Sequence, residues 1–157
     1  MMAQNHLFSD VWRKGGNMGR ILAVDLGSRR IGLAISDELE LTGQPMGSLS
    51  SRGERADLEM IAQVARQEEA AGVVVGLPLR MDGSRGPEAR QAERFVKGLQ
   101  AALDIPVWAW DERLTTAQAE RVLIEGGTRR RKRRQALHPV AAALILQGFL
   151  DRRRKRA

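Results

Sequence analysis

One stretch near the start of the chain constrains the fold more than any other. Residues 18–37, MGRILAVDLGSRRIGLAISD, read as a buried apolar strand over 21–24, a tight turn around Gly27, and a second strand over 31–35. The first strand ends on Asp25. Because an unpaired buried carboxylate costs several kcal/mol, we expect Asp25 to be held by an arginine, a metal ion, or a phosphate bound through a metal.

The rest of the chain alternates helical and strand patterns, which is typical of an α/β fold. The expected elements are a weak strand at 46–49, a helix at 55–70, a strand at 73–77, a helix at 87–103, a strand at 106–110, a helix from Thr115 to Gly126-Gly127, and a helix at 140–150 that starts at Pro139. An early meander supplies antiparallel strands, and helical crossovers then add parallel ones. We therefore predict a mixed five-stranded sheet flanked by helices.

The chain length suits one domain with a proper core. We assign residues 18–151 to this domain, 1–17 to a poorly ordered N-terminal extension, and 152–157 to a basic tail. In sheets of this kind, ligands bind at the carboxyl ends of the parallel strands. Asp25 and Asp111-Glu112 both lie at such ends, as does the loop that follows residue 77. These segments are distant in sequence, and we expect them to share one site.

Basic residues are concentrated in two runs. The chain has a formal net charge of +7, with 26 basic and 19 acidic residues, and residues 129–134 and 152–156 hold 11 of the basic ones. The rest of the chain is therefore about −4. Such runs bind phosphate backbones by releasing counterions, although a solvated loop and a frayed terminus would also explain them. Two runs flanking one helix favour a nucleic-acid partner.

Other features of the composition exclude several classes of protein. Cysteine is absent, so disulfides and thiolate metal sites are excluded. No apolar run approaches the ~20 residues that a membrane span needs, and the polar N-terminus lacks a signal-peptide core. We expect a cytoplasmic protein that has no membrane partner.

Four segments carry a family resemblance that spans residues 18–151. VDLGSRRIGLAISD, VVVGLPLRMDGSRGPEA, WDERLTTAQAE and HPVAAALILQGFL resemble, in order and spacing, the four blocks of the YqgF family. Members of that family have an RNase H-like fold and are described as Holliday-junction resolvases or pre-16S ribosomal RNA nucleases. The resemblance implies an RNase H-like endonuclease that uses a divalent metal, Mg²⁺ or Mn²⁺, held by carboxylates.

The resemblance assigns the catalytic positions to Asp25, Glu112 and His138, with Asp25 and Glu112 as the metal ligands. His138 is a departure, because the family pattern has an aspartate there. Mg²⁺ prefers oxygen ligands, and imidazole suits softer ions. His138 could instead be a general acid–base, a cationic phosphate contact, or only a residue that opens a helix.

The carboxylates also have structural alternatives. Asp25 could form a buried salt bridge with Arg29 or Arg30, and Glu112 could be an exposed turn residue before the Thr115 helix. The tryptophans at 108 and 110 alternate along a strand, which predicts a core role for at least one of them.

Candidate substrate-binding residues surround these positions, and each has a competing role as a solvated or capping residue. Gly-containing loops such as 78–86 can present backbone N–H groups to phosphates. The candidates are Arg80, Arg85, Arg113, Thr115, Arg130 and Arg131.

The leading function is a metal-dependent endonuclease that processes the 5′ end of the pre-16S ribosomal RNA. The first alternative is a resolvase of branched DNA, which needs paired sites, and we expect a monomer or weak dimer. The second is a nucleic-acid-binding protein whose catalysis is weakened because His138 replaces the third carboxylate. The DLGS turn also resembles the phosphate loop of actin-like sugar kinases, but those enzymes need two domains and a longer chain.

Overall fold

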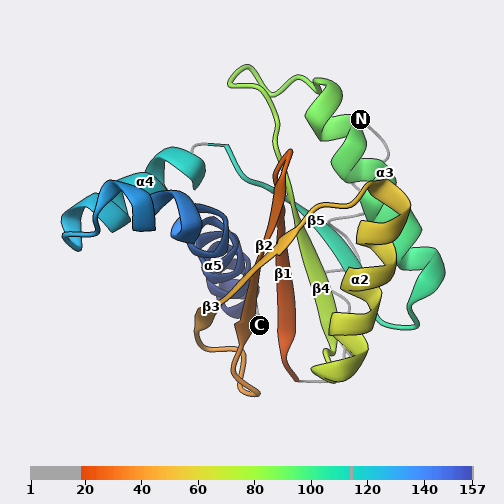
Figure 1. Cartoon of the computed structure of the whole chain (residues 1–157). Coiled ribbons are helices and arrows are strands. Elements are labelled where there is room, and N and C mark those ends of the chain that lie inside the picture. The colour runs from red at the N-terminus through yellow and green to blue at the C-terminus, as the bar shows by residue number, and fades with distance from the viewer. Residues whose placement is uncertain (1–18, 114, 157) are drawn as a thin grey trace.

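A five-stranded sheet lies between helices on both of its faces (Figure 1). The computed structural model describes residues 19–113 and 115–156. The elements are β1 (Ile21–Leu26), β2 (Arg30–Ser36), β3 (Gly43–Ser50), α2 (Glu54–Gln67), β4 (Gly72–Leu77), α3 (Pro87–Ala102), β5 (Val107–Asp111), α4 (Thr115–Glu125) and α5 (Arg130–Arg156). The predicted strands are all present, and β3 is longer than its sequence suggested.

The strand order is β3-β2-β1-β4-β5. Strands β1, β2 and β3 pair antiparallel, whereas β1 pairs parallel with β4 and β4 with β5. The predicted mixed α/β sheet is therefore confirmed. Because β1, β4 and β5 run in the same direction, Asp25, Leu77 and Asp111 all lie at one end of the sheet.

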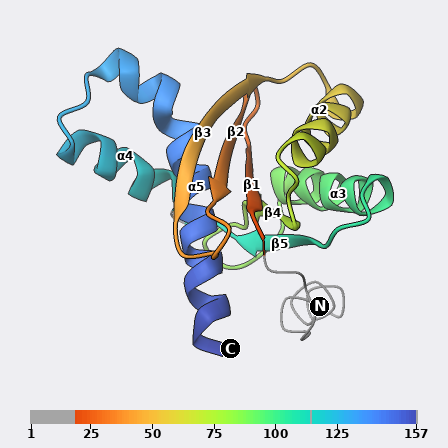
Figure 2. The same cartoon turned by 90° about the horizontal axis from the view of Figure 1, so that it is seen from below.

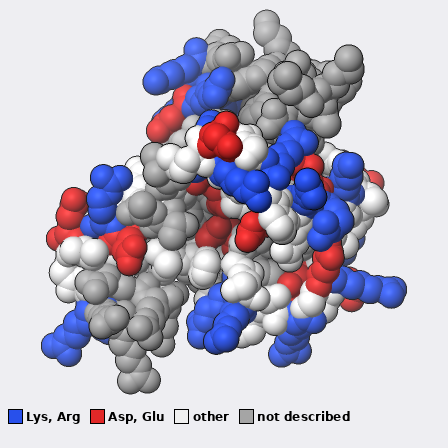
Figure 3. Space-filling model, turned by 90° about the horizontal axis from the view of Figure 1, so that it is seen from above, with Lys and Arg blue, Asp and Glu red and all other residues white. Residues whose placement is uncertain are grey.

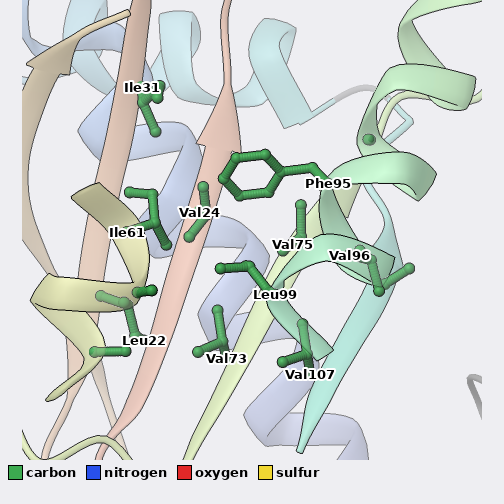
Figure 4. Packing of buried hydrophobic residues seen from close by; sticks show 14 of the residues in the cluster. Leu22, Val24, Ile31, Ile61, Val73, Val75, Phe95, Val96, Leu99 and Val107 are labelled. Carbon is green, nitrogen blue, oxygen red and sulfur yellow. The ribbon is translucent and has the colours of Figure 1, made fainter. Parts of the chain in front are cut away.

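Alternation along the strands divides the core between the two faces. On one face, α2 and α3 cover a cluster that includes Val24, Ile61, Val75, Phe95 and Leu99 (Figure 4). The opposite face packs against α5, where its cluster includes Ala23, Trp108, Ile145, Leu146 and Phe149. Asp25 is in phase with Ala23, so the strand pattern directs its side chain towards α5.

Trp108 and Trp110 pack on the α5 face, as a core role requires. Their ring centroids lie 5.0 Å and 5.8 Å from that of Phe149. On the same face, Ile145 and Phe149 are buried, and Leu144 is only partly buried. Leu146 and Leu150 supply the further buried contacts of this helix.

The last helix is much longer than predicted. Helix α5 begins at Arg130 rather than at Pro139, so the prediction of a helix confined to 140–150 is wrong. Proline has no N–H to donate, so it is tolerated in the first turn of a helix but disfavoured in the interior, which is why the sequence suggested a start at Pro139. Arginine and lysine favour helices, and α4 packs against α5, so tertiary contacts support the extra turns. Both basic runs are consequently helical over 130–134 and 152–156.

Helix α4 and the start of α5 form a helical hairpin beside the sheet (Figure 2). In the described residues, no helix is long and apolar enough to cross a membrane. The prediction of a poorly ordered extension at 1–17 falls outside the residues that the structure describes.

Candidate active site

The centre of the site is a contact between β1 and α5. His138 Nδ1 lies 2.8 Å from Asp25 Oδ2, within hydrogen-bond distance. The Asp25 side chain is 8% exposed, and the imidazole is 31% exposed. Among the described residues, Asp25 forms no ion pair with Arg29 or Arg30, so the salt bridge that the sequence allowed is not formed. The contact with Asp25 raises the pKa of His138, because the carboxylate stabilises the charged imidazolium.

The second carboxylate reaches the same place from the end of β5. The Glu112 backbone N–H donates to the Leu77 carbonyl at 3.1 Å, which ties this residue to the end of β4. Burial, the charge of Asp25 and a hydrogen bond with Asp25 raise the pKa of Glu112 to about 9. At neutral pH, Glu112 therefore retains a proton, since two adjacent carboxylates in a buried site cannot both ionise easily.

Glycines leave the space that these side chains occupy. A Cβ atom at Gly76 would collide with the Glu112 carboxylate and would lie 2.7 Å from Ile145 Cδ1. A Cβ atom at Gly27 would lie 2.6 Å from His138 Cε1, and one at Gly32 would overlap the His138 backbone. All of these separations are shorter than van der Waals contact. The glycines in the first and second motifs thus make room for the site.

Two adjacent carboxylates fit a hard divalent cation. Mg²⁺ is commonly held by one or two carboxylates, with water and substrate phosphates completing its shell. Burial and the charge of Asp25 raise the pKa of Glu112, and a cation bound beside the two carboxylates would favour their ionised forms. In the part of the chain that the structure describes, no three His, Asp or Glu side chains are arranged to hold a metal together. Asp25 and Glu112 are the two carboxylates that could hold such an ion, and His138 is hydrogen-bonded to Asp25.

Two of the predicted substrate-binding arginines are already paired within the protein. Arg113 donates from Nε to Asp111 Oδ2 at 2.9 Å, and its backbone N–H donates to Asp111 Oδ1 at 3.0 Å. Its Nη1 also donates to the Met81 carbonyl at 3.4 Å. Arg85 Nε lies 3.0 Å from Glu93 Oε1. These charges brace the loop at 78–86 and the start of α3.

The other predicted positions lie around the same end of the sheet. Arg80 is exposed, and its backbone N–H donates to the Ser84 carbonyl at 2.9 Å. Thr115 begins α4, and its N–H donates to the Glu112 carbonyl at 2.9 Å. Arg130 and Arg131 form the start of α5, but their side chains fall outside the described set.

Seen from this end, acidic side chains lie in the middle of the face and basic ones gather around them (Figure 3). A mixed sheet with carboxylates at the ends of β1 and β5, and a side chain from the last helix beside them, has the architecture of an RNase H-like domain. The chain belongs to the RuvX family, described as Holliday junction resolvase, which matches residues 19–152.

Curated relatives cover nearly the same residues. A protein of Halothermothrix orenii is 46% identical over 136 residues, which span 87% of this chain and 97% of the relative. One from Anaeromyxobacter dehalogenans (strain 2CP-C) is 50% identical over 134 residues, with 85% and 98% covered. Both carry the name "Putative pre-16S rRNA nuclease".

Solved structures share the fold at low identity. Thermus thermophilus RuvC, in complex with a Holliday junction substrate, has a TM-score of 0.52 and 16% identity, covering 85% of this chain and 95% of its own. The fowlpox virus resolvase, in complex with Holliday junction DNA, has a TM-score of 0.56 and 14% identity, covering 85% and 97%. These likenesses concern the fold.

The glycines that make room for the site were not predicted from the sequence. Gly76 interrupts a run of β-branched residues in β4, and Gly32 interrupts the apolar pattern of β2. A glycine inside a strand often marks a close approach of another group, so this signal was present in the sequence. The identity of the approaching groups, Glu112 and His138, depends on tertiary contacts.

Proposed function

We propose that this protein hydrolyses phosphodiester bonds near the 5′ end of the pre-16S ribosomal RNA, with Asp25 and Glu112 as ligands of Mg²⁺ or Mn²⁺. The observation that carries the proposal is the contact between these two carboxylates, which together with burial raises the pKa of Glu112 to about 9. A divalent cation bound there would stabilise the charge that develops on the phosphate oxygens during hydrolysis.

The protein's own residues prepare the site for this chemistry. Leu77 and Gly76 fix the position of Glu112, one by a backbone hydrogen bond and the other by leaving space for its carboxylate. His138 holds one oxygen of Asp25 and so restricts the rotation of that carboxylate.

The choice of RNA rests on the relatives. Proteins that are 46% and 50% identical over most of the chain are named as nucleases of pre-16S ribosomal RNA, whereas the junction-resolving structures share only the fold. We accordingly infer a cytoplasmic enzyme that acts as a monomer or weak dimer. Resolution of branched DNA would require two paired sites and hence a stable dimer.

The test is cleavage of a labelled pre-16S transcript by purified protein in Mg²⁺, in Mn²⁺ and in EDTA. Asp25→Asn keeps the size of the side chain but removes its charge. We expect metal-dependent cleavage by the wild type and its loss in this variant. Metal-dependent cleavage that survives Asp25→Asn would refute the assignment of the site. A matched four-way DNA junction, tested under the same conditions, separates the resolvase from the ribosomal RNA nuclease.

One observation favours a second candidate, a binding protein with weakened catalysis. His138 stands where the family pattern has an aspartate, and its Nδ1 is bonded to one of the two carboxylate oxygens of Asp25. This candidate predicts binding of the transcript without cleavage in either metal. His138→Asp would then restore cleavage, because it supplies a third oxygen ligand and releases Asp25.

A further inference from the structure

Three arginines lie along one side of the carboxylate pair. Arg29 lies in the turn between β1 and β2, Arg30 is the first residue of β2, and Arg52 lies between β3 and α2. The Ser51 N–H donates to the Arg29 carbonyl at 2.9 Å, and Arg30 pairs with Ser50 in the β2–β3 register. Residues from two separate segments are thus brought together at the end of the sheet where Asp25 lies.

A buried carboxylate fixes the backbone that carries Arg52. Asp57, which is 7% exposed, accepts hydrogen bonds from the Ser51 hydroxyl at 2.5 Å and from the Arg52 N–H at 2.7 Å. The turn on the other segment is closed by the Gly27 N–H, which donates to the Arg30 carbonyl at 2.9 Å. Because both segments are held in place, their arginines lose little additional backbone freedom on binding a ligand.

The strand phase places Arg30 on the face of the sheet that holds the site. Its neighbour Ile31 belongs to the core beneath α2 and α3, so Arg30 points towards α5, as Asp25 does. Arg30 also lies close enough for its charge to oppose the protonation of His138. If the scissile phosphate binds at the carboxylate pair, Arg30 can therefore contact the neighbouring phosphate of the same strand.

The charges of these arginines remain available. All three side chains are exposed, and among the described residues none forms an ion pair with an Asp or Glu. On the opposite side of the carboxylates, Arg85 is paired with Glu93 and Arg113 with Asp111. Basic side chains border the central acidic region in Figure 3. The ion pairs of Arg85 and Arg113 reduce the net positive charge on their side of the carboxylates, so the side with Arg29, Arg30 and Arg52 is the more positive.

We propose that Arg29, Arg30 and Arg52 form a phosphate-binding surface that holds the RNA backbone beside the scissile bond. We name this trio the arginine arm. It deepens the proposed function by fixing the side of the site over which the strand runs, and it rests on that function for the identity of the ligand. Arginine suits this task because its planar guanidinium can bind phosphate through two parallel hydrogen bonds.

The test measures binding in EDTA, so it does not depend on cleavage. The affinity of a labelled pre-16S transcript is measured from 50 to 300 mM salt for the wild type and for the triple variant Arg29→Gln/Arg30→Gln/Arg52→Gln. Loss of three phosphate contacts should lower the slope of log K against log salt by about 2. The dissociation constant at low salt should rise roughly tenfold.

The matched control removes the same charge elsewhere. Arg20→Gln/Arg66→Gln/Lys97→Gln alters three exposed residues at the start of β1, in the last turn of α2 and on α3. This variant should leave the salt slope within about 0.5 of the wild-type value. Thermal unfolding of each variant verifies that the fold is intact.

A further variant separates charge from structure. Replacing the three arginines of the arm by lysine should restore most of the salt slope, because lysine still neutralises phosphate as a point charge. An equal loss of slope in the control triple, or a full loss in the lysine variant, would overturn the proposal. Failure of the cleavage test with normal binding slopes would instead refute the nuclease assignment and leave the arginine arm intact.

Discussion

Two largely buried glutamates, Glu40 and Glu112, have raised pKa values, but their nearest charged neighbours have opposite signs. Glu40, in the connection between β2 and β3, is 9% exposed and lies 3.6 Å from Arg153 Nη1. Burial raises its pKa, and the charge of Arg153 opposes that rise. Burial also raises the pKa of Glu112, but its nearest charged partner is Asp25, which raises that pKa further to about 9.

The difference lies in the source of the positive charge. Arg153 belongs to α5 and is itself fixed by stacking over Trp108, with its guanidinium carbon 5.3 Å from the ring centroid. The fold therefore supplies the cation for Glu40, and that end of the sheet is structural. At the other end, the fold brings two carboxylates together, and the partner that it supplies is His138, whose charge depends on pH. We regard this imbalance as the mark of the active site.

The largest expected effect is on the cleavage rate, which should fall when Glu112 is replaced but not when Glu40 is replaced. Glu112→Gln should lower the cleavage rate by at least about a thousandfold, because a metal ligand contributes several kcal/mol to the transition state. Glu40→Gln should change the rate by less than about twofold, since Glu40 lies at the opposite end of the sheet. Single-turnover cleavage of the pre-16S transcript measures both. Equal losses in the two variants would show that stability, and not ligation, controls the rate.

The next effect concerns stability against pH in metal-free buffer. Between pH 4.5 and about 9, the native state binds a proton at Glu112 that the unfolded state has lost, so the free energy of unfolding falls as pH rises. The expected decrease from this one group is on the order of 4 kcal/mol between pH 5 and pH 8. Urea unfolding over this range should show the decrease in the wild type, and Glu112→Gln should remove it. Parallel pH profiles for the two proteins would contradict the assignment of this proton.

A smaller effect tests the space around Glu112. Gly76→Ala places a methyl group against the Glu112 carboxylate and Ile145, and such overpacking typically costs about 1–3 kcal/mol. We expect the unfolding free energy to fall by about that amount and cleavage to fall with it. Gly126→Ala is the control, because its Cβ would be 3.4 Å or more from any neighbour. If both substitutions prove neutral, Glu112 does not occupy the space above Gly76.

The sheet and the two carboxylates were predictable from the sequence for a physical reason. Apolar alternation identifies strands, and parallel strands bring their carboxyl ends together, so the order of the elements is enough to pair Asp25 with Glu112. The predicted start of α5 was wrong because proline is disfavoured inside a helix, so the sequence placed Pro139 in the first turn. In the fold, the helix begins at Arg130 and contacts α4, which supports the turns before Pro139. Such contacts join residues that are distant in sequence.

Local sequence patterns also could not show which arginines are free to bind a phosphate. Arg85 was predicted because it adds charge to the loop at 78–86, and Arg113 because it follows Glu112, yet each is paired with an acidic side chain in the fold. Arg29 was considered only as a partner for Asp25, and Arg52 lies outside the four motifs. Whether an arginine can bind a phosphate depends on which carboxylates surround it, and that is a property of the folded chain.

The most direct test of this account is calorimetric titration of the protein with Mn²⁺ at pH 7, in two buffers of different ionisation enthalpy. The difference in heat gives the number of protons released as the ion binds. If the carboxylate pair is a cation site, the wild type releases about one proton per ion, and Glu112→Gln releases none. Binding of Mn²⁺ to Glu112→Gln with unchanged affinity and unchanged proton release would contradict the central claim.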